Sequence, residues 1–248
     1  MVMTILPGLT TTVQDEIPRF VADLAESDVR TIAFFPTAID PPARVDLYRE
    51  LERIDGLRLP HVHLRTDCDV SEIDYLVGRF SAEVFNVHPA ESRHPFGDIP
   101  PRLVGRFFME NVEVVVSDDD FKRVAGICPD FSHLEAARLM GRTDYYDTTM
   151  RQLSTRVVGC CHVSAIRPGD PNEWNGGPDH HRFVSLANLD YLVRYRRYLP
   201  HRWVSLELEN PLSEQIDAIA YLSRKLGYQE STLPPYVSPA PNPTVRTV

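Results

Sequence analysis

Several features that mark other classes of protein are scarce in this sequence. Its apolar runs are too short to span a membrane, and residues 1–6 lack the basic start of a signal peptide. The four cysteines do not have the spacing pattern of a disulfide-stabilised scaffold. Together these absences predict a cytoplasmic protein that makes no membrane contact.

Glycine-rich loops and lysine are also scarce. No glycine-rich phosphate loop follows the first expected strand at residues 4–8, which argues against a nucleotide-binding fold. Lys122 and Lys225 are the only lysines, whereas arginine is abundant. Because the net charge is −9 and the pI is about 5.5, the chain as a whole does not attract nucleic acid or anionic membranes. A local basic patch and a homo-oligomeric state are both left open.

The residues that are abundant indicate a globular α/β protein. Hydrophobic residues make up 43% of the chain and charged residues 25%, which is typical of a domain with a sizeable core. Short apolar runs alternate with segments whose apolar residues recur at helical spacing. The expected strands are residues 4–8, 31–36, 57–64, 82–87, 106–109, 126–128, 157–165 and 203–208. The expected helices are residues 13–26, 43–54, 70–80, 101–105, 117–125, 133–155, 186–198 and 213–226.

Eight strands that alternate with helices predict a single (β/α)8 TIM barrel over residues 1–231. A doubly wound open sheet is the alternative. Residues 232–248 are rich in proline and contain little to bury, so we expect a C-terminal arm that lies on the surface or is disordered.

Residues of metal-ligand type stand at or just after the ends of most expected strands. They are His61 and His63, His88, Glu110, Asp130 with His133, His162, the run from Asp179 to His181, and Glu207. In a barrel these strand ends surround one site. Several carboxylates in one buried place repel one another unless cations or protons neutralise them, so the pattern predicts a metal site. His94 and His201 fall outside the pattern and are expected on the surface.

The most informative stretch is residues 128–133, where a strand leads into a helix. Asp130 and His133 are three residues apart, so in the first helical turn they would face the same way and share one cation. The alternative is that Asp130 only caps the helix and His133 is an ordinary polar residue. At the third strand the sequence does not decide between His61 and His63, although His63 lies nearer the rim.

A second informative stretch is the loop at residues 175–181. Its two glycines and one proline allow the chain to turn back towards the rim. Because side chains two apart in an extended segment point to the same side, Asp179 and His181 would bind one ion while His180 faces away. An exposed polar turn is the alternative.

In this order, the residues resemble those of the xylose-isomerase-like barrel superfamily, and the set is most similar to endonuclease IV. That resemblance implies nine residues that hold three zinc ions: His63 (or His61), His88, Glu110, Asp130, His133, His162, Asp179, His181 and Glu207. The sugar isomerases and epimerases of the superfamily share five of them: Glu110, Asp130, His133, His162 and Glu207. In those relatives the two glutamates bind one metal and move a proton between carbons. Multinuclear iron oxidases that modify peptides have a similar Asp-x-His.

Three departures from these families matter. Residues 4–8 lack the histidine that often opens the endonuclease site, and there are no long basic or aromatic loops that could bind bent DNA. The xylose isomerase mechanism requires a lysine, and no lysine falls near a strand end. The leading hypothesis is therefore a divalent-metal isomerase or epimerase that acts on a small sugar-like or phosphorylated substrate. Glu110 and Glu207 would be its acid–base pair, and His133 and Arg167 would contact the substrate.

The sequence also allows three alternative functions, which we rank below the isomerase or epimerase. Hydrolysis of a phosphodiester, as in endonuclease IV, is the first alternative, followed by an iron oxidase and by a barrel that keeps only a structural metal. The cofactor would be one to three ions of zinc, manganese, cobalt or iron. A small molecule is the expected partner, and nucleic acid is disfavoured by the charge.

Overall fold

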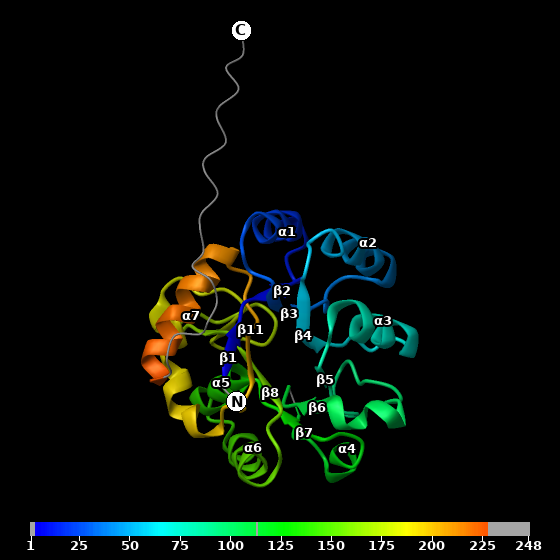
Figure 1. The fold of residues 1–248 in the computed structure, drawn as a ribbon. Coiled ribbons are helices and arrows are strands. Elements are labelled where there is room, and N and C mark those ends of the chain that lie inside the picture. Colours follow the sequence, from blue (N-terminus) through cyan, green and yellow to red (C-terminus); the bar gives the residue numbers. More distant parts are fainter. Residues whose placement is uncertain (1–2, 113, 228–248) are drawn as a thin grey trace.

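The computed structural model describes residues 3–112 and 114–227, which form β/α units around a barrel (Figure 1). The strands are β1 (Thr4–Leu6), β2 (Gly8–Thr10), β3 (Thr31–Phe35), β4 (Arg58–His63), β5 (Val84–Val87), β6 (Phe107–Glu110), β7 (Gly126–Cys128), β8 (Cys160–Val163), β9 (Ala165–Ile166), β10 (Asp179–His180) and β11 (Trp203–Leu206). The α-helices are α1 (Ile17–Glu26), α2 (Pro41–Leu51), α3 (Val70–Phe80), α4 (Asp118–Phe121), α5 (Phe131–Leu139), α6 (Thr143–Thr155) and α7 (Leu212–Leu226). The 3-10 helices are η1 (Gln14–Glu16), η2 (Pro101–Arg106) and η3 (Leu186–Tyr198).

The strand order confirms the predicted (β/α)8 barrel. Strands β2 to β7 form a parallel sheet in sequence order, and β1, β11 and β8 form a second parallel sheet. β1 and β2 are two halves of the first barrel strand, separated by Pro7, which has no N–H to donate. Since the last strand pairs with the first, the open doubly wound alternative is wrong.

The pairing is not continuous around the barrel, because β7 and β8 meet only at a seam. Two isolated bridges cross it, between Ile127 and Val158 and between Asp130 and His162. A Cβ on Gly126 would lie only 2.1 Å from the Val157 carbonyl oxygen, so the backbones approach more closely here than any larger residue allows. This seam lies directly beneath two of the predicted metal ligands.

Apolar side chains fill both the barrel interior and the layer between strands and helices. The barrel interior is closed at one end by a cluster of Leu6, Ala33, Phe35, Phe108, Cys128, Cys160 and Trp203. All four cysteines are free and buried, which agrees with a packing role. No helix in residues 3–112 and 114–227 is both long and apolar enough to cross a membrane.

Several expected elements differ from the structure, among them the helix expected over residues 117–125, which is limited to α4. Residues 133–155 form two helices rather than one, because Gly141 adopts a left-handed conformation with φ of 71° and ends the first. Residues 157–165 were expected to form one strand, but regular pairing is limited to β8 and the short β9, which pairs with β10 as a hairpin. The predicted arm at residues 232–248 lies outside the described residues.

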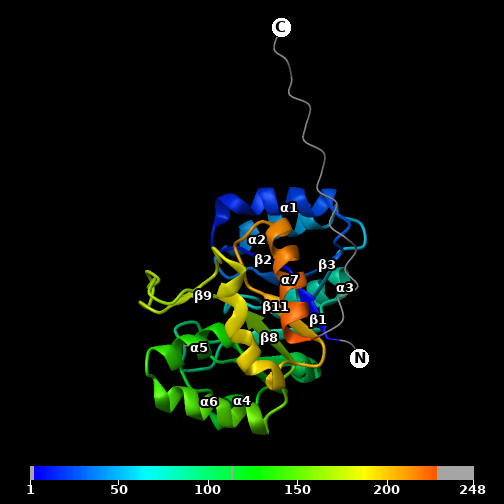
Figure 2. The same cartoon turned by 90° about the vertical axis from the view of Figure 1, so that its left-hand side faces the viewer.

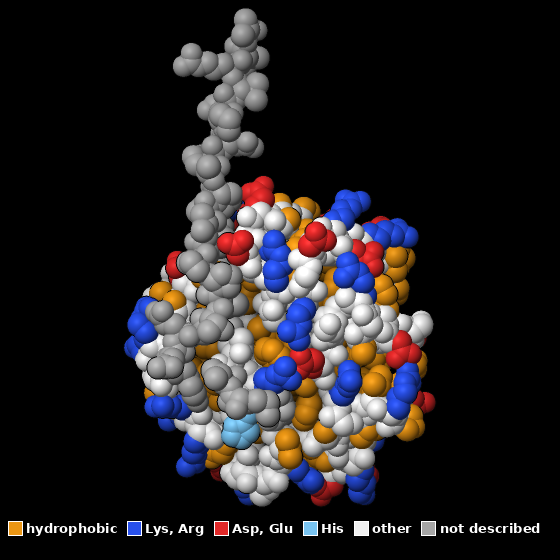
Figure 3. All heavy atoms as spheres, viewed as in Figure 1, with side chains coloured by type: hydrophobic (Ala, Val, Ile, Leu, Met, Phe, Trp, Pro, Cys, Tyr) orange, Lys and Arg blue, Asp and Glu red, His pale blue; other side chains and the backbone are white. Residues whose placement is uncertain are grey.

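The two ends of the barrel differ in what they carry. The strands begin at the end that faces the viewer in Figure 1, where Lys and Arg side chains are interspersed with Asp, Glu and apolar groups (Figure 3). The loop between β9 and β10 projects from the opposite end, as an arm at the left of Figure 2. The carboxyl ends of the strands, and with them the predicted ligands, lie at that opposite end.

Candidate metal centre

A cavity with a volume of about 550 Å³ opens at the carboxyl end of the barrel. Its lining contains seven of the nine residues predicted as ligands: His63, His88, Glu110, His133, Asp179, His181 and Glu207. The two remaining residues, Asp130 and His162, are almost fully buried at the barrel rim. The barrel topology therefore brings strand ends far apart in sequence to one place, as the sequence predicted.

Three donors from neighbouring strands β4, β5 and β6 form a first group. The Nε2 atoms of His63 and His88 lie 3.0 Å apart. The Oε2 atom of Glu110 lies 3.6 Å from His63 Nε2 and 3.7 Å from His88 Nε2. All three atoms thus surround one point above the ends of these strands.

A second group lies beside the first and shares Glu110 with it. The Nδ1 atom of His162 lies 3.2 Å from Glu207 Oε2, 3.7 Å from Glu110 Oε2 and 3.9 Å from Asp130 Oδ2. Three carboxylates around one imidazole would repel one another without a positive charge among them. Because the Oε2 atom of Glu110 takes part in the short distances of both groups, this one oxygen faces both of them.

The residues of both groups fit a divalent metal. Ligand atoms about 2.1 Å from one ion stand roughly 3.0 to 3.4 Å apart, close to the separations found here. Among the described residues, Asp130 Oδ2 and both ring nitrogens of His162 are buried without a hydrogen-bond partner. Buried polar atoms are rarely left in that state, so an ion is the expected partner. Imidazole and carboxylate donors suit zinc, manganese, cobalt or iron.

Asp130 combines the two roles that the sequence offered as alternatives. Its Oδ1 atom caps α5 by accepting a hydrogen bond of 2.9 Å from the backbone N–H of His133. The same oxygen accepts a second hydrogen bond from the Ser132 hydroxyl. Its Oδ2 atom faces His162 and His133 instead. The cap fixes the carboxylate so that its second oxygen points into the centre.

A buried chain of hydrogen bonds fixes Glu110. Asn86 donates from Nδ2 to Glu110 Oε2 over 2.5 Å, so its own Oδ1 accepts from His61 Nε2 over 3.0 Å. His61 Nδ1 then accepts from the Ser205 hydroxyl over 2.7 Å. With both ring nitrogens engaged below the rim, His61 orients the site, and His63 is the residue of the pair that faces the cavity.

The histidines of the first group are held neutral. Burial lowers the pKa of His88 to about 4 and that of His63 well below its ordinary value, with the neighbouring histidines adding to the effect at His63. Neutral imidazole is the form that binds metals.

The second group holds protons when no ion is bound. Burial raises the pKa of Glu110 to about 8, with Glu207 and Asp130 adding to the effect. Burial would lower the pKa of His162, but the carboxylates around it outweigh that and raise it to about 9. The same pairing keeps the pKa of Glu207 well below its usual range, against the effect of burial.

The remaining predicted ligands are less closely assembled. Asp179 Oδ2 accepts from His133 Nδ1 over 3.0 Å, and His133 Nε2 lies 3.7 Å from Asp130 Oδ2. His181 instead lies with Nδ1 3.9 Å from Glu209 Oε1 and stacks on Trp174. Asp179 and His181 therefore contact different partners in the structure, while His180 faces away, bonded to the Asp170 carbonyl over 2.8 Å.

If Asp179 and His181 bind a third ion, as the resemblance implies, Asp179→Ala and His181→Ala should each lower bound metal by about one equivalent per chain, as the loss of one of few ligands does. His180→Ala is the matched control, because its ring points away from the cavity. Elemental analysis after dialysis measures the change. Wild-type metal content in all three variants would show that the loop is only a polar turn, and that metal is bound by the first and second groups alone.

Arg167, predicted to contact the substrate, is not among the described residues that line the cavity, and its guanidinium pairs with the Asp170 carboxylate three residues on. His94, expected on the surface, is exposed and also lines the cavity, together with Arg93, Arg142 and Trp174. These four lie in loops or at a helix end, where apolar periodicity gives no signal. The one available sign was a tryptophan in an otherwise polar, glycine-containing loop.

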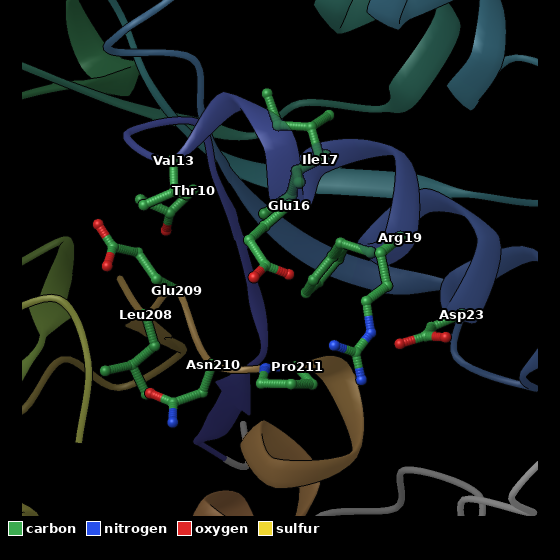
Figure 4. Close-up of a pocket in the computed structure, with 12 residues that line it drawn as sticks. Thr10, Val13, Glu16, Ile17, Arg19, Asp23, Leu208, Glu209, Asn210 and Pro211 are labelled. Carbon is green, nitrogen blue, oxygen red and sulfur yellow. The ribbon is translucent and has the colours of Figure 1, made fainter. Parts of the chain in front are cut away.

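A smaller hollow adjoins the site between α1 and residues 208–211 (Figure 4). Its volume of about 20 Å³ suffices for about one water molecule. Glu209 lies between the two spaces and accepts a hydrogen bond of 2.6 Å from the Thr12 hydroxyl. Of these two adjoining spaces, the large cavity is the one that has room for a substrate.

Comparison with known proteins gives only distant likenesses. No family model matches the sequence, and no curated protein matches it. A solved xylose isomerase domain protein from Alicyclobacillus acidocaldarius subsp. acidocaldarius is similar in structure, with 15% identity and a TM-score of 0.49, over 90% of this chain and 99% of its own. An uncharacterized B. cereus protein has 7% identity and a TM-score of 0.42, over 93% of this chain and 66% of its own.

Proposed function

We propose that the protein is a metal-dependent hydrolase that cleaves a phosphate ester of a small molecule with two or three divalent ions. The observation that carries this proposal is the position of Glu110 Oε2, which lies within 3.7 Å of donors from both groups. A carboxylate shared in this way is suited to bridge two neighbouring ions, an arrangement common in enzymes of phosphate ester hydrolysis. The geometry thus favours the first alternative from the sequence over the isomerase.

The two groups divide the ligands between them. His63, His88 and Glu110 would hold one ion, and Glu110 with Asp130, His162 and Glu207 would hold the second. Such ions supply charge neutralisation for a phosphate and lower the pKa of a water molecule.

The protein's own groups would complete the reaction. Burial opposes the charged form of His133, but Asp130 and Asp179 outweigh it and raise its pKa to about 10. A ring that donates to Asp179 from Nδ1 over 3.0 Å is held in place and can hold a proton for the leaving oxygen when the phosphorus–oxygen bond breaks. His133 is therefore the residue that we assign to the leaving group.

The size and charge of the protein support a small substrate rather than nucleic acid. The cavity volume of about 550 Å³ lies within the range of small-molecule sites. The net charge of −9 opposes binding to a polyanion.

An isomerase or epimerase of small sugars remains the second candidate, because one observation favours it. Glu110 and Glu207 lie on either side of His162, 3.7 Å and 3.2 Å from its Nδ1 atom. Two carboxylates around one ion position could remove and return a proton at neighbouring carbons. In that case only the second group would need an ion.

We expect the metal-loaded protein to release phosphate from a panel of phosphomonoesters or to cleave phosphodiesters of similar size, and not to exchange solvent deuterium into ketoses. Colorimetric phosphate release and NMR in D2O measure the two reactions. Deuterium exchange into a sugar without hydrolysis would replace the proposal with the isomerase. Oxygen consumption by the iron-loaded protein would indicate an oxidase. If the protein turned over no substrate and Glu207→Gln changed none of its properties, the metal would have only a structural role.

A further inference from the structure

Trp174 is exposed, whereas the phenylalanines and the other tryptophan of this protein are buried. All eleven phenylalanines are buried, and so is Trp203, the other tryptophan. Trp174 is 52% exposed. Leaving an indole in water forgoes the gain from burying about 150 to 250 Å² of surface, so its position needs a reason outside folding.

The position of this ring is at the mouth of the metal-lined cavity. Trp174 lies on the arm between β9 and β10 that projects from the barrel (Figure 2) and lines the cavity. One face of the indole is stacked on His181, with ring centroids 5.6 Å apart and an angle of 26° between the planes. The stack orients the ring but leaves about half of the residue without cover.

Other apolar residues continue the surface that Trp174 begins. Val112, Ala136, Ala137 and Met140 line the same cavity, and with Trp174 we name them the apolar wall. Met140 is 47% exposed at the end of α5. A Cβ on Gly177 would lie 3.3 Å from Met140 Sδ, so the arm reaches this helix end. Helix and arm thus present one surface to the cavity.

Inorganic phosphate alone does not account for the apolar wall. Phosphate is bound by charged and polar groups, and the groups that would bind it already lie deeper in the cavity. A flat, weakly polar group stacks well on an indole and on a methionine sulfur. The remaining lining adds Arg93, His94 and Arg142, which favour an anionic ligand.

We propose that the apolar wall binds a planar, unsaturated organic group that is joined to the phosphate of the substrate, with Trp174 as its stacking platform. This inference rests on the proposed function for the phosphate end and adds the class of the organic group, an aryl or heterocyclic phosphate ester. The phosphate lies at the shared metal groups, and the ring lies over Trp174.

Two non-hydrolysable probes that differ only in the ring test this inference. Phenylphosphonate and methylphosphonate are titrated by calorimetry into the full-length, zinc-loaded protein. We expect phenylphosphonate to bind about tenfold more tightly, the usual gain from one aromatic stack. Its binding should also quench tryptophan fluorescence, because Trp203 is buried and Trp174 is the ring in reach.

Substitutions assign the preference to the ring. Trp174→Ala should abolish the tenfold preference for phenylphosphonate over methylphosphonate, whereas Trp174→Phe should keep most of it. Val184→Ala is the matched control, since Val184 is 72% exposed and is not among the described residues that line the cavity. Equal affinities of wild-type protein for the two probes, or a preference that survives in Trp174→Ala, would overturn the inference. A retained ring preference without any phosphate ester hydrolysis would instead refute the proposed function alone.

Discussion

Glu110→Gln should remove at least one equivalent of bound metal and reduce turnover by at least about a thousandfold. Loss of a single group that stabilises charge in an active site already costs about a hundredfold to a thousandfold. Here the same oxygen serves both groups, at 3.6 Å and 3.7 Å from His63 and His88 and at 3.7 Å from His162. The neutral amide still offers an oxygen to Asn86, so the substitution removes charge with little change of shape.

Glu209→Gln is the control for this experiment. Glu209 lines the same cavity and undergoes the same chemical change, but its carboxylate is bonded to the Thr12 hydroxyl at the edge. We expect it to keep its metal and to lose activity less than about tenfold. Metal analysis and steady-state kinetics are measured on both variants. Full metal content in Glu110→Gln would show that the two groups do not share an ion ligand, and the two-ion proposal would fail with it.

Zinc should bind to the metal-free protein more tightly as the pH rises from 6 to 8, by up to about a hundredfold per pH unit. The pKa values of Glu110 and His162 are raised to about 8 and about 9, so both groups hold protons at neutral pH. Each proton that a metal must displace weakens apparent binding about tenfold for every pH unit below the pKa of the group. The sign is therefore fixed: acid favours the proton and base favours the ion.

Competition with a chelator of known affinity measures the pH dependence, and calorimetry in two buffers of different ionisation enthalpy counts the protons released. The histidines of the first group should contribute few protons in this pH range, because burial lowers the pKa of His88 to about 4 and that of His63 well below its ordinary value. Affinity that does not change across this range would mean that the second group does not take up an ion.

The parts of the site that follow from barrel topology were predictable. Strands of alternating β/α units end at one rim, so Glu110 and Glu207 must lie close together although 97 positions separate them in the sequence. Which of His61 and His63 faces the cavity was not predictable, because both point into the barrel and differ only in depth. Depth depends on the register of each strand, and the pairing of β3 with β4 shifts register between Thr31 and Ala33.

The loops were the least predictable part. Arg167 was expected to contact substrate, but an acidic residue three positions on offered a nearer partner. His94 and Trp174 reach the cavity through loops whose paths depend on many tertiary contacts. The break at Gly141 was visible as a glycine within a helical pattern, yet such a residue either interrupts a helix or is tolerated by it.

The seam between β7 and β8 gives the metal centre a mechanical meaning. Asp130 and His162 stand on opposite sides of the place where strand pairing lapses, joined there by one bridge. An ion held by both side chains would link β7 to β8 where their backbone pairing is interrupted. Metal binding would then stabilise this part of the barrel against unfolding, and removal of the ion by a chelator would lower its stability.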